Sequence, residues 1–182
     1  MKRALLLAAL ALGSGAAGFM LYLGLSGADS PAGSLPPAPQ AQQAAAFAPD
    51  FVLPDVTGTE RASDEWSGSI RVVNFWATWC PPCVREIPLL VDVQAEYGAR
   101  GVQVIGIAID ETDAVVAFAD DFAFNYPVLV GQEDAMALGH RFVDGFIGLP
   151  FTVFTGRDGR IHRVHTGEIH REQIEAILAE LL

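Results

Sequence analysis

The 182-residue chain is poor in positive charge and in cysteine. A single lysine, Lys2, and ten arginines stand against 22 aspartates and glutamates, so the formal net charge at pH 7 is −11. Nucleic-acid binding needs clustered basic side chains to neutralise phosphates, and this composition excludes that class of partner. The two cysteines are Cys80 and Cys83. A structural zinc site usually takes four ligands, often from two such pairs, and no second pair exists here.

The first stretch of the chain lacks charge altogether after Lys2 and Arg3, from Ala4 to Leu25. Basic residues before a long apolar run are typical of a secretory signal or a signal anchor. The run is longer than a usual signal core and long enough to cross a bilayer, which favours an uncleaved anchor over residues 1–26. With Lys2 and Arg3 held inside, the rest of the chain is exported. In a bacterium we therefore expect a periplasmic domain anchored in the inner membrane, or a free periplasmic domain if the signal is cleaved.

The segment that follows is rich in Ala, Pro, Ser, Gly and Gln and has little to bury, so residues 27–46 are expected to form a flexible tether. Residues 47–182 are then the folded domain. There, apolar runs typical of buried strands alternate with helical patterns, which indicates an α/β domain of three layers. Strands are expected over 51–56, 70–77, 101–110 and 126–130 and in a hairpin over 151–165, and helices over 63–68, 81–98, 113–122, 134–142 and 171–182.

Both cysteines lie in "NFWATWCPPC", residues 74–83, between an expected buried strand and an expected helix. A thiol at a helix N-terminus faces unpaired N–H groups and the positive end of the helix dipole, and both lower its pKa. The thiolate is the form that attacks disulfides. We therefore expect Cys80 to attack a partner disulfide, and the more buried Cys83, one turn on, to resolve the mixed disulfide.

Three other uses of the pair are weighed against this redox interpretation. Zinc lacks ligands, because His162 and His165 are three residues apart in an expected strand and face opposite ways. A copper-carrying site made of the cysteine pair and a distant histidine is a second alternative. A purely structural disulfide between such near neighbours would constrain little chain entropy and stabilise weakly.

The segment "VVNFWATWCPPCVREIPLL", residues 72–90, resembles the active-site region of membrane-anchored thioredoxin-like thiol–disulfide oxidoreductases of the TlpA/ResA type. The resemblance extends over nearly all of residues 49–182. It implies a thioredoxin-like fold, a central mixed sheet flanked by helices, with a helix–strand insert at about 113–131. It also implies that the protein is an enzyme that needs neither a metal nor another cofactor.

The resemblance also implies roles for individual residues. "GLPF", residues 148–151, matches the cis-proline loop, so the Leu149–Pro150 bond is expected to be cis and the Leu149 backbone to pair with a substrate strand. Glu86 matches the acidic residue that such reductases keep just after the second cysteine, and we expect it to exchange a proton with that thiol. Asn74 stands where thioredoxin itself has a buried acid, which makes Glu86 the better candidate for this proton exchange. The catalytic residues are then Cys80, Cys83 and Glu86, and the expected substrate contacts are Trp79, Pro81, Pro82, Leu149 and Pro150.

The function implied is a periplasmic, membrane-tethered reductase of protein disulfides. A membrane thiol reductant would supply its electrons, and an apocytochrome c in cytochrome c maturation would be one substrate. Phe151 departs from the polar or acidic residue that often follows the cis-proline in cytochrome-maturation reductases, which admits a broader set of substrates. Two alternatives stay open: the same fold run as a disulfide-forming oxidant, and a copper-handling protein that serves oxidase assembly.

Overall fold

The structure is a computed structural model that describes residues 47–145 and 148–182. The expected anchor, residues 1–26, and the expected tether, residues 27–46, lie outside the described residues. Within the described ranges, no helix has the length and hydropathy needed to cross a membrane.

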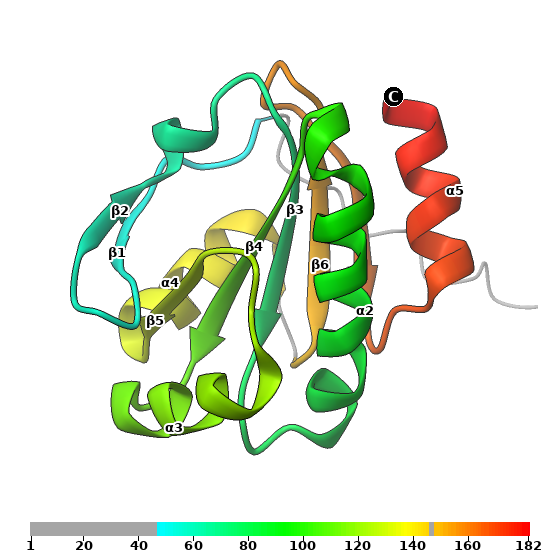
Figure 1. Cartoon of the computed structure of the whole chain (residues 1–182). Coiled ribbons are helices and arrows are strands. Elements are labelled where there is room, and N and C mark those ends of the chain that lie inside the picture. The colour runs from blue at the N-terminus through cyan, green and yellow to red at the C-terminus, as the bar shows by residue number, and fades with distance from the viewer. Residues whose placement is uncertain (1–46, 146–147) are drawn as a thin grey trace, which may run out of the picture. The chain divides into compact units, whose positions relative to one another are not determined.

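A five-stranded mixed sheet forms the middle of the domain, with strand order β5-β4-β3-β6-β7 (Figure 1). Strands β3, β4 and β5 run parallel to one another, and β6 and β7 continue the sheet in antiparallel fashion. The central β3 and β4 are almost wholly buried, as their continuous apolar sequences predict. The bounds are β3 Ile70–Trp76, β4 Val102–Ile109, β5 Val128–Gly131, β6 Phe151–Thr155 and β7 Ile161–Thr166.

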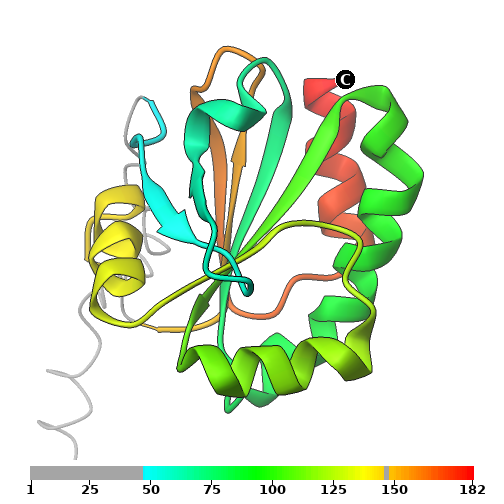
Figure 2. The ribbon, with the colours of Figure 1, turned by 60° about the vertical axis from the view of Figure 1, so that its left-hand side comes forward.

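Helices cover both faces of this sheet, which gives the expected thioredoxin-like three-layer fold (Figures 1 and 2). On one face, α2 (Pro81–Tyr97) and α5 (Arg171–Leu181) bury their apolar sides in a cluster with residues of β3, β4, β5 and β6. The apolar side of α3 (Thr112–Phe122) joins the same cluster. The opposite face carries α4 (Glu133–Phe142) and residues from the small antiparallel sheet that precedes β3.

The core on the α4 side is built around stacked aromatic rings. The ring of Phe75 on β3 stacks on Phe151 of β6 with centroids 4.3 Å apart, and Phe142 of α4 meets it edge-on at 5.5 Å. All three side chains are almost completely shielded from solvent. Because Phe75 and Phe151 are register partners across β3 and β6, this stack fixes the strand pair that leads into the site described below.

Replacing Phe75 with alanine is expected to lower the free energy of unfolding by about 3–5 kcal/mol, because it removes a fully buried ring and leaves a cavity. Urea unfolding followed by circular dichroism measures the change. Val116 on α3 is 40% exposed, so Val116→Ala serves as the control and should cost less than about 0.5 kcal/mol. A loss at Phe75 no larger than the loss at Val116 would contradict the packing described here.

Several element boundaries differ from those expected from the sequence. The expected strand at 51–56 is only β1 (Val52–Pro54), and it pairs with β2 (Glu60–Ala62), whose polar sequence gives no strand signal. The segment 63–68 holds a short 3₁₀ helix, η1 (Ser63–Trp66), and a second one, η2 (Gly98–Arg100), follows α2. Strand β5 starts two residues later than expected, because it pairs with β4 only from Val128.

Two hydroxyl residues that suit helix N-caps by type, Thr112 and Ser63, lie inside their helices. Thr112 lies in the first turn of α3, and Glu111 precedes it as the N-cap residue, without a side-chain cap. Ser63 belongs to η1, and its hydroxyl instead accepts a hydrogen bond from the Phe51 N–H at 3.2 Å. In both places the pattern identified the helix, but the cap residue is one position earlier.

Candidate active site

The two cysteines lie where β3 turns into α2. Strand β3 ends at Trp76, and Cys80 is the N-cap residue of α2, with Pro81 and Pro82 in the first turn. Proline fits there, because these positions have no N–H partner inside the helix. A disulfide joins Cys80 to Cys83, with Cα atoms 5.3 Å apart. Cys83 is fully buried and Cys80 is 5% exposed, so Cys80 is the sulfur closer to solvent.

The cis-proline loop lies at the same edge of the sheet. The Leu149–Pro150 bond is cis, as the resemblance implied. Pro150 comes directly before β6, and Phe151 at the start of that strand pairs with Phe75 near the end of β3. Since β3 and β6 are antiparallel, this register brings Pro150 to the end of the sheet where the chain leaves β3 for Cys80. Pro150 also accepts a hydrogen bond, from the Gly167 N–H to its carbonyl oxygen at 2.8 Å.

A side chain from the neighbouring strand holds the turn between β3 and Cys80. Asp110 follows the last residue of β4, and its Oδ2 accepts hydrogen bonds from the Thr78 N–H at 2.9 Å and the Thr78 hydroxyl at 2.7 Å. Its Oδ1 accepts from the N–H of Glu111 at 2.8 Å. The carboxylate thereby fixes the backbone two residues before Cys80, so it positions the turn without reaching the sulfurs.

A buried carboxylate lies one helical turn beyond Cys83. Glu86 is 2% exposed, and its two oxygens accept from groups on two other elements. Asn74 Nδ2 on β3 donates to Oε1 at 2.7 Å, and the Ile169 N–H donates to Oε2 at 2.9 Å. The same Asn74 Nδ2 is 3.0 Å from Thr152 Oγ1 on β6. Residues three apart on a helix share a face, so Glu86 and Cys83 both point from α2 into the core.

Burial dominates the electrostatics of this carboxylate. It raises the pKa of Glu86 from 4.5 to about 7, since an ionised carboxylate is poorly solvated in the core. The hydrogen bonds from the Ile169 N–H and Asn74 lower the pKa, and the negative charge of Glu168 raises it. Glu86 can therefore take up or release a proton close to neutral pH, as a general acid or base requires.

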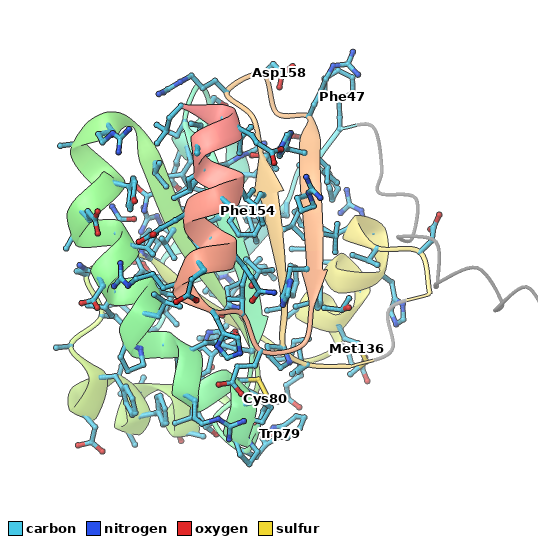
Figure 3. The ribbon with its side chains drawn as sticks, turned by 90° about the vertical axis from the view of Figure 1, so that its right-hand side faces the viewer. Phe47, Trp79, Cys80, Met136, Phe154 and Asp158 are labelled. Atoms are coloured by element: carbon cyan, nitrogen blue, oxygen red, sulfur yellow. A yellow bond between two sulfur atoms is a disulfide. The ribbon has the colours of Figure 1, made fainter. Side chains whose placement is uncertain are left out.

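The expected substrate contacts surround the disulfide at different depths. Trp79 is 67% exposed, and Figure 3 shows it beside Cys80, at the end of the domain opposite Phe47 and Asp158. Pro81 is exposed, and Pro82 and Leu149 are half-buried. Pro150 is buried beneath them. The structure thus brings the expected catalytic and contact residues to one end of the sheet, with an apolar, accessible rim and a buried carboxyl group behind it.

Two residues that hold the site were not assigned these contacts from the sequence. In the sequence Asp110 is only the last residue of the strand expected over 101–110, and Asn74 is only the replacement of a buried acid. In the structure Asp110 accepts a hydrogen bond from the Thr78 hydroxyl, and Asn74 donates one to Glu86. A sequence signal existed for Asp110, because an acidic residue at the C-terminal end of one parallel strand lies near the loop that leaves the next.

A family model and curated relatives both match this chain over most of its length. Residues 44–164 match the AhpC/TSA family. The thiol–disulfide oxidoreductase ResA of Geobacillus kaustophilus is 31% identical over 136 residues, which cover 74% of this chain and 75% of that protein. ResA of Bacillus cereus is 30% identical over 169 residues, which cover 92% of this chain and 90% of that protein.

Solved structures with the same fold carry related names. A thiol:disulfide interchange protein of the thioredoxin family from Chlorobium tepidum superposes with a TM-score of 0.68 and 29% identity, covering 74% of this chain and 94% of that one. A putative thiol:disulfide interchange protein DsbE from Chlorobium tepidum gives a TM-score of 0.67 and 27% identity, covering 78% of this chain and 100% of that one.

Proposed function

Since the chain belongs to the AhpC/TSA family and is a thiol–disulfide oxidoreductase of the ResA and DsbE type, we propose that it works as a reductant of disulfides in partner proteins. The observation that carries the proposal is the buried carboxyl group of Glu86, with a pKa of about 7, one turn behind the cysteine pair. The Cys80–Cys83 disulfide is then the oxidised form, which must be reduced before each turnover.

In the proposed cycle, the Cys80 thiolate of the reduced chain attacks one sulfur of a partner disulfide. A bond forms between Cys80 and that sulfur, and the partner's other sulfur leaves as a thiolate. The Cys83 thiol then loses its proton to the Glu86 carboxylate and attacks the Cys80 sulfur. The bond between Cys80 and the partner breaks, and the partner's second sulfur leaves and is protonated. The proton that Glu86 took from Cys83 goes to this second sulfur, so two electrons and one proton pass from the cysteine pair to the partner, whose first sulfur stays a thiolate.

The proposed direction follows from the charge behind the pair. A strongly oxidising dithiol protein owes its potential to a stabilised reduced form. Here the group buried beside Cys83 is a carboxylate, and its negative charge disfavours a neighbouring thiolate. The N-terminus of α2 acts in the opposite sense on Cys80. A carboxylate on the Cys83 side therefore supports a pair that gives up electrons rather than one that accepts them.

The proposed setting is the bacterial periplasm, with the apolar segment 1–26 as an inner-membrane anchor and residues 27–46 as the tether. Phe47, the first described residue, lies at the end of the domain opposite Cys80, so a tether would leave the site free to face partners (Figure 3). The electron donor would be a membrane thiol reductant. Substrates would be exported proteins with a disulfide in an accessible segment, apocytochrome c among them.

The reduction potential of the Cys80–Cys83 pair tests the direction. Equilibrating the purified chain with graded thiol buffers and trapping free thiols should give a value at or below about −200 mV, on the thioredoxin side of the scale. A pair at that potential can donate electrons to strained or exposed disulfides, whose potentials are higher than those of structural disulfides. A value near −120 mV, typical of a strong periplasmic oxidant, would overturn the reductant proposal and support disulfide formation instead.

A further inference from the structure

An exposed ion pair lies directly beside the buried carboxylate. Arg85 Nε donates to the two carboxylate oxygens of Glu168 at 3.1 and 3.0 Å, and Arg85 Nη2 donates to Oε2, so the pair is bidentate. Arg85 is next to Glu86 on α2, and Glu168 is next to Ile169, whose N–H donates to Glu86. Two adjacent residues of α2 thus bind two adjacent residues of the connection between β7 and α5.

This 167–170 connection is otherwise held by contacts close to the site. Gly167 donates its N–H to the carbonyl of the cis-proline, Pro150, at 2.8 Å. The Nε2 of His165 lies 3.1 Å from the Glu168 carbonyl oxygen. The connection therefore runs from the cis-proline loop to Glu86, and the Arg85–Glu168 pair fastens it to α2 from the solvent side.

We propose that Arg85 and Glu168 are positioning residues, which hold the 167–170 connection against α2 so that the Ile169 N–H stays hydrogen-bonded to Glu86. This inference rests on the proposed role of Glu86 as the proton acceptor for Cys83. A bidentate arginine–carboxylate pair fixes geometry as well as charge, which is what a hydrogen bond from the next residue requires. Its exposure makes it sensitive to salt, because charges in solvent are screened.

The groups that face Glu86 set its pKa and determine how that pKa should change when the 167–170 connection loosens. Asn74 on β3 and the Ile169 N–H lower its pKa, whereas burial and the negative charge of Glu168 raise it. Tyr126, between α3 and β5, is buried and interacts electrostatically with Glu86, and burial keeps its own pKa raised so that it stays neutral. Arg85 lies on the solvent side, where it neutralises Glu168. Loosening the connection therefore removes one of the two hydrogen bonds that lower the pKa of Glu86.

Positioning and simple charge effects predict opposite results at Glu168. If Glu168 acted only through its charge, Glu168→Gln would lower the pKa of Glu86, because a repulsive negative charge disappears. If it holds the connection, Glu168→Gln should raise that pKa, because the Ile169 hydrogen bond weakens. Arg85→Gln should raise the pKa of Glu86 under both explanations. The direction of the pKa change in Glu168→Gln therefore distinguishes them.

The experiment measures the pKa of Glu86 in the oxidised full-length chain by ¹³C NMR of the side-chain carboxyl groups. Arg85→Gln and Glu168→Gln are each expected to raise it by about half a unit. The charge-swapped double variant Arg85→Glu/Glu168→Arg should restore the original value, since it rebuilds the pair in reverse. High salt should move the original chain in the same direction as the single variants.

Arg163→Gln is the matched control, because Arg163 is an exposed arginine paired with Glu180 at 3.3 Å and takes no part in the contacts around Glu86. It should leave the pKa of Glu86 unchanged. A lower pKa in Glu168→Gln, or no restoration in the charge-swapped variant, would overturn the positioning role. The titration needs no turnover, so its result is independent of the reduction potential that tests the reductant proposal.

Discussion

Cys80→Ser is expected to abolish disulfide exchange, with a loss of at least about 10³-fold in the rate of reduction of a disulfide-containing peptide. Cys80 is the sulfur nearer solvent and the residue at the N-terminus of α2, where a thiolate is stabilised. A serine hydroxyl at the same place stays protonated and cannot form the mixed disulfide. The rate is measured under single turnover, by mixing the pre-reduced chain with the peptide.

Cys83→Ser is the matched control, since it removes the other half of the same pair. It should still react with the peptide but stop at a covalent complex, because the resolving sulfur is gone. Mass spectrometry of the mixture should show the chain joined to one peptide through Cys80. Full activity in Cys80→Ser, or no covalent complex in Cys83→Ser, would contradict the assigned order of attack.

Glu86→Gln should slow the resolving step by about 10²-fold or more, because the Cys83 thiol loses the group that accepts its proton. The rate of the original chain should rise with pH as Glu86 ionises around pH 7, and the variant should lose this rise. Stopped-flow measurement of product release between pH 5 and 9 gives both results. Glu96→Gln is the control, because Glu96 is an exposed glutamate on the same helix. An unchanged pH profile in Glu86→Gln would remove Glu86 from the mechanism.

Although Glu86→Gln should slow the reaction, it should stabilise the folded chain at alkaline pH. The folded-state pKa of Glu86, about 7, lies above the ordinary value of 4.5, so between these two pH values the folded chain binds more protons than the unfolded chain. Its contribution to stability is therefore fully present below the lower value and falls as pH rises through the window, by about 3 kcal/mol in total. Glu86→Gln should flatten this part of the stability curve and leave the chain more stable at pH 8.

The sequence predicts the main elements best where one pattern dominates. The buried strand and the helix that flank the cysteines were expected over 70–77 and 81–98, and the structure has 70–76 and 81–97. The apolar run and the two prolines act locally, so no distant contact is needed to place them. Strand β2 could not be found in this way, because "ERA" forms a strand only through its pairing with β1.

The features of the site also differ in whether the sequence alone can predict them. The cysteine pair, Glu86 and the cis-proline could be located from motifs and the family resemblance. The bonds of Glu86 to Asn74 and Ile169, and of Asp110 to Thr78, depend on which strands lie side by side and on how α5 is connected. Residues 32 positions apart, such as Thr78 and Asp110, meet only because β3 and β4 are parallel neighbours.

The two prolines that open α2 also affect what happens when the disulfide is cut. A helix begins with four N–H groups that have no partner inside it. Pro81 and Pro82 supply none, and the Cys80 N–H already donates to the Ala77 carbonyl at 3.2 Å, which leaves the N–H of Cys83 as the remaining one of the four. The Cys80 side chain makes no capping hydrogen bond. The end of the oxidised helix therefore forms without a side-chain cap, and the N–H of Cys83 remains to face the Cys80 thiolate once the disulfide is cut.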